Sequence, residues 1–242
     1  MDQDSNNKFT VSVWGIPLAI TLLIWLVKIT EIMKETQFGS YGIHPGVFSG
    51  LRGVLFAPLI HGSVLEHLLP NTFPVLILLL GLFYFYKKAA VVILLWSWLI
   101  TGLWTWAIGS PGYHIGASGL IYALASFIFF SGLIRKNNSL LALSLLVVFL
   151  YGGLVWGIFP YKPNISWESH ISGAISGLIL ALYYRHIGPQ RKRFEWELEN
   201  DENATADDDP INPAEHEFRP FLKIGYSNIR ILHRAHRIFF YS

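Results

Sequence analysis

The chain has 242 residues, of which 52% are hydrophobic, 15% are aromatic and only 14% are charged. Soluble domains carry charge on about a quarter of their positions, so the composition excludes an ordinary soluble domain. The net charge of +2 and the lack of a long basic run argue against nucleic acid as a partner. The chain has no cysteine, which excludes disulfides, thiolate metal sites and a cysteine nucleophile.

Six apolar runs follow one another along the chain, over residues 11–27, 68–86, 89–107, 116–133, 140–159 and 170–184. Each is close to the length of about 20 residues that a helix needs to cross a bilayer. The runs are continuously apolar rather than alternating, and lipid cannot satisfy free backbone groups, so helices are expected and a β-barrel is not. The sequence predicts an all-α, polytopic membrane bundle of six transmembrane helices over residues 11–187.

The segments outside these runs are more polar. Residues 1–10 precede the first run, and residues 31–66 form a long loop whose apolar patch at 54–60 suggests a part that dips into the membrane interface; a plain surface loop is the alternative. Residues 188–242 form a polar tail with an acidic centre. The tail ends in FLKIGYSNIRILHRAHRIFFYS, which can form an amphipathic helix that rests on anionic lipid or binds a partner.

Positive charges in the short loops indicate the orientation of the chain. Lys87 and Lys88 follow the second run, Arg135 and Lys136 follow the fourth, and a basic cluster starts at Arg185 after the sixth. The opposite short loops are poor in Lys and Arg, so the positive-inside rule places both termini in the cytoplasm. We expect a multi-pass protein of a bacterial cytoplasmic membrane, in which the second, fourth and sixth helices begin at the outer face.

Ser118 stands in the sequence YHIGASGLIYAL, two residues after Gly116 and directly before Gly119, where the fourth run begins. The start of a helix has free backbone N–H groups and the positive end of the helix dipole. A serine hydroxyl there lies beside groups that can stabilise an oxyanion, as acyl transfer requires. Small residues in this stretch equally suit close helix packing, and the fragment alone leaves both interpretations open.

His170 opens the sixth run and is followed by Gly173 and Gly177. These glycines share a helix face with His170 and let another helix approach closely, which brings the imidazole within reach of a neighbouring helix. An ionisable residue at the end of a membrane helix is a candidate functional residue. A histidine that is hydrogen-bonded to interfacial water is the alternative.

His67 and Asn71 are four residues apart at the start of the second run, and both side chains can donate hydrogen bonds. Two donors directed at one point have the chemistry of an oxyanion hole. As metal ligands, His61, His67 and His170 would have only Glu66 near them in sequence, which is a poor set. No metal and no cofactor is therefore expected.

The predicted topology brings these candidates to one level. His67, Asn71, Ser118 and His170 all lie near the outer starts of the second, fourth and sixth helices. Such convergence favours a serine hydrolase site over four unrelated packing residues.

These motifs resemble those of the rhomboid family of intramembrane serine proteases. That family has His-x-x-x-Asn on the second helix, Gly-x-Ser-Gly at the start of the fourth, and a histidine followed by two glycines on the sixth. Here they read HLLPN from His67, GASG around Ser118 and HISGAISG from His170. The resemblance covers roughly residues 11–184, and three motifs in order on the expected helices are a specific match.

The resemblance implies a Ser-His dyad without an aspartate, in which Ser118 is the nucleophile and His170 is the general base and then the acid. It further implies that His170 rests on Tyr122 and that the Ser118 backbone N–H, His67 and Asn71 form the oxyanion hole. The expected substrates are single-pass membrane proteins, cut near the outer boundary of their transmembrane segment.

Two positions depart from the family pattern. His61 precedes His67 by six positions, one more than in many relatives, and Leu51-Arg52 stands where many relatives have Trp-Arg. Both departures concern the local shape of the loop at residues 31–66. A non-catalytic rhomboid-like protein that binds client transmembrane helices is the main alternative, although such proteins usually lack the serine or the histidine. A small transporter is less favoured, because the chain shows neither an internal repeat nor charges spread through its spans.

Overall fold

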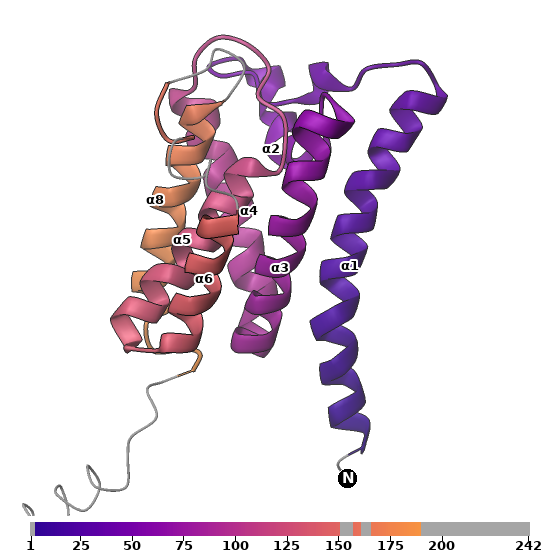
Figure 1. Cartoon of the computed structure of the whole chain (residues 1–242). Coiled ribbons are helices and arrows are strands. Elements are labelled where there is room, and N and C mark those ends of the chain that lie inside the picture. Colours follow the sequence, from indigo (N-terminus) through magenta and orange to yellow (C-terminus); the bar gives the residue numbers. More distant parts are fainter. Residues whose placement is uncertain (1–2, 151–156, 161–165, 190–242) are drawn as a thin grey trace, which may run out of the picture. The chain divides into compact units, whose positions relative to one another are not determined.

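Helices make up nearly all of the regular structure in the computed structural model, which describes residues 3–150, 157–160 and 166–189. The long helices stand side by side in a bundle (Figure 1). They are α1 (Gln3–Met33), α3 (Leu69–Tyr86), α4 (Ala90–Ile108), α5 (Ser118–Arg135), α6 (Asn138–Leu150) and α8 (Trp167–Tyr183). The all-α membrane bundle predicted from the apolar runs is confirmed. The predicted amphipathic helix of the tail lies outside the described residues.

Among the residues that the structure describes, four helical segments are long and apolar enough to cross a membrane: Val13–Met33, Val64–Tyr86, Ala90–Ile108 and Ser118–Arg135. Helix α8 has 17 residues, which is the lower limit for a span. Helix α6 has 13 residues up to Leu150, where the described part is interrupted. The predicted end of the fifth run at residue 159 is wrong, because residues 157–160 form turns and bends. Gly157 and Pro160, both poor helix formers, explain that ending.

The core is built around α5, whose Ile121, Leu124, Phe127 and Ile128 are completely or almost completely buried. Helices α3, α4, α6 and α8 all pack against it. Helix α1 packs mainly on α3 and stands at one edge of the bundle (Figure 1). The helix that begins with Ser118 is therefore the most firmly held element of the structure.

Glycine lets α8 approach α5 until their backbones touch. A Cβ atom on Gly173 would lie 2.1 Å from the Gly119 carbonyl oxygen, and one on Gly177 would lie 2.2 Å from the Ala123 carbonyl oxygen. Real Cβ atoms do not come so close, so no larger residue fits without a shift of the helices. The glycine face predicted after His170 thus faces the helix that carries Ser118.

The long loop after α1 is folded onto the bundle. It contains the short helical turns η1 (Gly39–Tyr41), η2 (Phe48–Arg52), α2 (Gly53–Phe56) and η3 (Ala57–Leu59). Val54 is buried against Gly102 of α4, and Trp98 donates a hydrogen bond of 2.9 Å to the Val54 carbonyl oxygen. The apolar patch at 54–60 is therefore only partly buried: Val54 packs on the bundle, whereas Leu55 and Phe56 are exposed.

Arg52 closes part of this loop on itself. Its guanidinium donates a hydrogen bond of 3.1 Å to the Ser40 carbonyl oxygen and lies over the Tyr41 ring, 4.8 Å from the ring centroid. The arginine of the Leu51-Arg52 pair therefore serves the shape of the loop.

Arg135 ties together the opposite end of the bundle. It is buried and donates hydrogen bonds to the Tyr86 hydroxyl at 2.9 Å and to the Arg185 carbonyl at 3.0 Å, and it also contacts the carbonyls of Tyr184 and Ile187. These contacts join the ends of α3, α5 and α8. Arg135 thus satisfies the free carbonyl groups at the end of α8 instead of standing in solvent as a loop charge.

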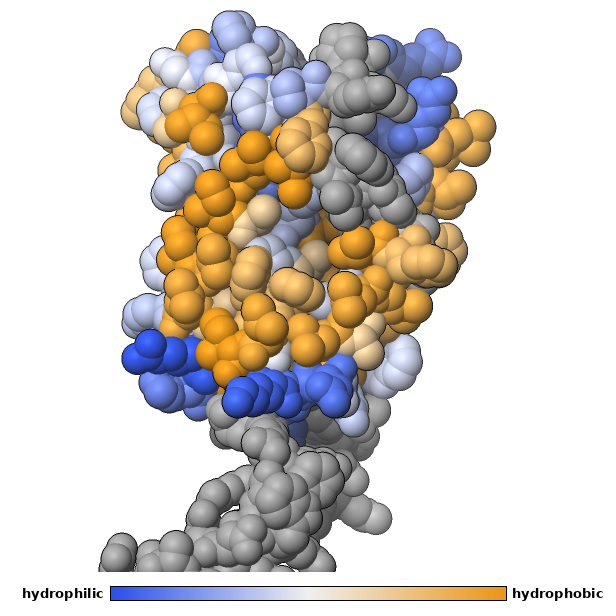
Figure 2. Space-filling model, turned by 60° about the vertical axis from the view of Figure 1, so that its left-hand side comes forward, coloured by the Kyte–Doolittle hydropathy of each residue, from blue (hydrophilic) through white to orange (hydrophobic). Residues whose placement is uncertain are grey.

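Hydrophobic side chains form a band across the surface. Figure 2 shows this band over the middle of the molecule, with hydrophilic residues gathered above and below it. The long helices carry many exposed apolar side chains, such as Leu22, Leu26, Leu95 and Leu182. An apolar belt between two polar ends is the surface that a lipid bilayer requires.

Candidate active site

Ser118 and His170 meet where α5 and α8 begin. Ser118 is the first residue of α5, and His170 lies in the first turn of α8. The His170 Nε2 atom is 2.9 Å from the Ser118 hydroxyl oxygen. The structure therefore brings the two residues into hydrogen-bond contact across 52 positions of sequence, through the helix contact that Gly173 permits.

The second nitrogen of His170 determines its tautomer. Its Nδ1 atom is 2.7 Å from the Gly157 carbonyl oxygen, which can only accept a hydrogen bond. Nδ1 must therefore carry the proton, and in a neutral ring Nε2 is then free to accept the proton of Ser118. This is the tautomer that a general base requires.

An aromatic ring fixes the plane of the imidazole. Tyr122 lies one helical turn after Ser118 and stacks on His170, with 4.2 Å between ring centroids and 15° between planes. Both side chains are buried. The nearby carboxylate, that of Glu168, instead accepts hydrogen bonds from the backbone N–H and the hydroxyl of Ser110.

His67 lies against the backbone just before Ser118. Gly116 has a φ of +107°, and a Cβ atom at this position would lie 2.3 Å from the His67 Nε2 atom. Glycine is therefore needed both for the backbone conformation and for the space that the imidazole occupies. Asn71 lines the same cleft one turn further on, so both predicted donors border the cleft that also contains Ser118.

His61 holds the same stretch of backbone from the other side. It is almost completely buried, and its Nε2 atom accepts a hydrogen bond of 3.2 Å from the Ala117 N–H. Burial lowers the pKa of His61 to about 3, helped by the neighbouring His67 and Lys28. The sequence analysis noted His61 as a poor metal ligand and for its spacing from His67, and this contact was missed.

The unusual spacing between His61 and His67 has a structural counterpart. The segment Val64–Leu68 is a π-helical turn directly before α3, and Ser63 caps it by accepting a hydrogen bond from the Glu66 N–H. A π-turn accommodates one residue more than an α-helical turn. The two imidazole rings still meet edge to face, with 4.9 Å between centroids.

A polar cleft of about 1300 Å³ opens at this end of the bundle. Its lining includes the four predicted residues His67, Asn71, Ser118 and His170. His114 borders it, held by the Ser166 hydroxyl and by the Ser110 carbonyl at 2.9 Å. In the part of the chain that the structure describes, no group of three or more His, Asp or Glu side chains is placed to hold a metal ion.

Comparison with known proteins places the chain in a family. The profile of the Rhomboid domain matches residues 47–187, which is more than half of the chain and contains every residue of the site. The chain belongs to the rhomboid family. Membership of this family of membrane proteins agrees with the apolar band and the helical bundle, so the chain is a multi-pass membrane protein that lies in a lipid bilayer.

Relatives of this rhomboid protein occur in mycobacteria. An uncharacterized protein of Mycobacterium tuberculosis is 35% identical over 189 residues, which cover 72% of this chain and 75% of the relative. An uncharacterized protein of Mycobacterium leprae is 32% identical over 207 residues, which cover 79% of this chain and 78% of the relative. The similarity therefore extends through most of both molecules.

Proposed function

We propose that this rhomboid protein is an intramembrane serine endopeptidase that cuts transmembrane segments of single-pass membrane proteins. The contact between the Ser118 hydroxyl and His170 Nε2 carries this proposal, together with the contact of His170 Nδ1 with the Gly157 carbonyl. A histidine in this tautomer and a serine at a helix start form a nucleophile and its base. If Ser118 served only helix packing and His170 only bonded to interfacial water, the two side chains would not need to contact each other.

The reaction follows from the positions of these groups. The Ser118 oxygen attacks the scissile carbonyl while His170 Nε2 takes the hydroxyl proton, and the imidazolium is stabilised through Nδ1–H by the Gly157 carbonyl. His170 then gives the proton to the leaving amine, which departs and leaves an acyl-enzyme on Ser118. Water, deprotonated by His170, releases the second product and restores the serine.

The tetrahedral oxyanion would lie at the start of α5. The Ser118 backbone N–H belongs to the free first turn of this helix, and His67 Nε2 and the Asn71 amide reach the same cleft. These donors stabilise negative charge as it develops, and this stabilisation is the largest contribution to acyl-transfer catalysis in many enzymes. Tyr122 and the Gly157 carbonyl hold His170 in place of the usual aspartate.

The cleft gives water access to the site, and the orientation of the bundle indicates where a substrate would be cut. Its polar lining, which includes Ser110 and His114, gives water a path to Ser118. With the basic loops in the cytoplasm, the site opens toward the outer side of the membrane. A substrate helix must unwind before its carbonyl is accessible, so cleavage is expected at small or helix-breaking residues near the outer boundary of the segment.

The direct test is covalent labelling of the detergent-solubilised protein with a fluorophosphonate probe. The native protein should be labelled, whereas Ser118→Ala and His170→Ala should not. Native labelling no stronger than that of Ser118→Ala would remove Ser118 as the nucleophile. Labelling combined with failure to cut a single-pass reporter protein in liposomes would leave a serine hydrolase of unknown use. Absence of native labelling would favour the non-catalytic alternative, in which the bundle binds client helices.

A further inference from the structure

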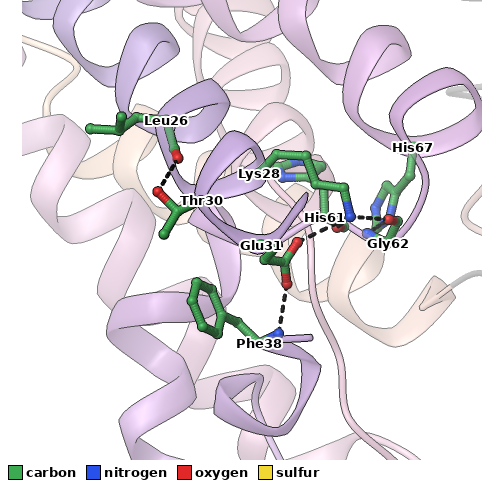
Figure 3. A network of polar contacts seen from close by, with 8 residues as sticks. All are labelled: Leu26, Lys28, Thr30, Glu31, Phe38, His61, Gly62 and His67. Atoms are coloured by element: carbon green, nitrogen blue, oxygen red, sulfur yellow. Dashed lines mark hydrogen bonds and ion pairs between the residues drawn. The ribbon is translucent and has the colours of Figure 1, made fainter. Parts of the chain in front are cut away.

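Lys28 is a charged residue on α1, and two of the residues that it contacts, His61 and Gly62, lie against His67. Its ammonium group contacts the Glu31 carboxylate at 3.0 Å, the His61 carbonyl at 3.0 Å and the Gly62 carbonyl (Figure 3). A lysine ammonium has three N–H donors, and these three acceptors engage all of them. The side chain is only 14% exposed, so the ammonium is fixed in one position.

Glu31 anchors this lysine from its own helix. One carboxylate oxygen binds Lys28, and the other accepts a hydrogen bond of 2.6 Å from the Phe38 N–H. Glu31 is buried, and burial of an acid and a base is costly unless they are paired and hydrogen-bonded. A buried ion pair near the outer end of an otherwise apolar membrane helix indicates a function.

The two carbonyls that Lys28 binds belong to the segment that orients His67. The Gly62 N–H donates a hydrogen bond of 3.3 Å to His67 Nδ1. A neutral imidazole has one donor and one acceptor nitrogen, so acceptance at Nδ1 places the proton on Nε2. That nitrogen faces Gly116, two residues before Ser118, and is therefore a donor on the oxyanion side of the site.

The same segment holds the start of α5. His61, whose carbonyl binds Lys28, accepts the Ala117 N–H through its ring. None of the residues that line the cleft comes from α1. Lys28 therefore acts on the site indirectly, through residues 61 and 62.

We propose that Lys28, held by Glu31, is a positioning residue for the oxyanion hole: it fixes the backbone of residues 61–62, so that Gly62 holds His67 with Nε2–H directed at the oxyanion. The proposal rests on the proposed serine-protease function. The alternative is that the ion pair merely attaches α1 to the bundle. That role would affect stability but not the donor state of His67.

A double-mutant cycle separates the two roles. The variant Lys28→Met/Glu31→Gln removes the charges without leaving a buried carboxylate unpaired, and Thr30→Val is the matched control. The Thr30 hydroxyl bonds to the Leu26 carbonyl within α1, away from the site (Figure 3). The second-order rate of fluorophosphonate labelling is measured for these variants, for His67→Ala and for the triple variant, with thermal unfolding recorded for each.

The charge-pair variant should be labelled about tenfold more slowly, and His67→Ala about a hundredfold more slowly, as for loss of one oxyanion donor. If Lys28 acts through His67, the triple variant should be no slower than His67→Ala. The proposal would be overturned if the labelling rate of the triple variant fell by the product of the two separate losses. A native labelling rate in the charge-pair variant would also overturn it. Thr30→Val should keep the native rate. If the charge-pair variant did not fold, Lys28→Gln/Glu31→Gln, whose amides can still hydrogen-bond, would take its place in the cycle with the same two criteria.

A measurement without activity separates this proposal from the proposed function. In ¹⁵N-histidine NMR spectra, the signal absent from His67→Ala identifies His67. It should show the Nε2–H tautomer in the native protein and a mixture of tautomers in the charge-pair variant. If native protein is not labelled by the probe, the protease proposal fails while this spectrum still decides the role of Lys28. An unchanged His67 spectrum in the variant would leave Lys28 as a structural tether alone.

Discussion

At the scale of single residues, His170 is oriented by a backbone carbonyl and an aromatic ring. Serine hydrolases with a triad use a buried aspartate to select the tautomer and to stabilise the imidazolium. Here the Gly157 carbonyl selects the tautomer, and the stacked ring of Tyr122 fixes the plane. A carbonyl is neutral and therefore easier to bury beside lipid than a carboxylate.

The Tyr122 ring, more than its hydroxyl, is expected to support catalysis. Tyr122→Phe retains the stacked ring and should keep the labelling rate of Ser118 within about threefold, whereas Tyr122→Ala should lose about tenfold, the scale of an aromatic pair. Fluorophosphonate labelling rates of the two variants, compared with native protein, test this. Equal losses in both variants would contradict the role of the ring.

His61 makes the stability of the protein depend on pH. Burial lowers its pKa from 6.5 to about 3 in the folded state. Between these values the unfolded chain binds a proton that the folded chain does not, so stability falls as the pH decreases below 6.5. At pH 5 this difference amounts to about 2 kcal/mol. His61→Asn, which can still accept from the Ala117 N–H, should lose less stability between pH 7 and pH 5 than native protein.

Chemical unfolding in detergent at the two pH values measures this difference. An equal loss of stability in native protein and in His61→Asn would show that His61 is not buried as a neutral group.

At the scale of elements, the contact between α5 and α8 sets the distance between nucleophile and base. Gly173 lies one turn below His170, and its position leaves no room for a side chain beside the Gly119 carbonyl. The π-turn Val64–Leu68 has a corresponding role at the start of α3, where it sets how His67 meets Gly116. Both sides of the candidate site therefore depend on backbone geometry.

A single methyl group at Gly173 should disturb the site. Its Cβ atom would lie 2.1 Å from the Gly119 carbonyl oxygen, so Gly173→Ala must push α8 away from α5 at a cost of about 1–3 kcal/mol. We expect a lower unfolding temperature and at least about a tenfold slower labelling of Ser118. Gly39→Ala is the control, because a Cβ atom there meets nothing within 4 Å. A native labelling rate in Gly173→Ala would show that the helix contact does not control the site.

At the scale of the whole molecule, the two ends of the bundle differ in charge and in content. Ser118, His170 and the cleft lie at the end where α3, α5 and α8 begin, whereas Lys87, Arg135 and Arg185 lie where these helices finish. The positive-inside rule then predicts that the site faces outward.

Cysteine accessibility tests this orientation, since the native chain has no cysteine. Ser40 and Ser139 are exposed at opposite ends of the bundle, and cysteine is close to serine in size. In intact cells an impermeant maleimide should modify Ser40→Cys, whereas Ser139→Cys should react only after permeabilisation. The reverse pattern would invert the proposed topology.

Much of the fold could be predicted because each transmembrane helix is specified by its own run of apolar residues. A continuous apolar run must be a helix in lipid, and the run predicted at residues 116–133 is helix α5, Ser118–Arg135. Helix ends were less certain: α1 continues to Met33, and the fifth run stops before Gly157. These ends depend on capping and on neighbouring segments rather than on hydrophobicity.

The sequence by itself determined the membrane class, the helix starts that carry Ser118 and His170, and the glycine face after His170. Only the tertiary structure decided that the Gly157 carbonyl selects the tautomer of His170, and that Lys28 on a peripheral helix reaches the segment beside His67. The reason is physical. A hydrophobic run and a small-residue face are properties of neighbouring residues, whereas a hydrogen bond between distant residues exists only after the bundle has packed.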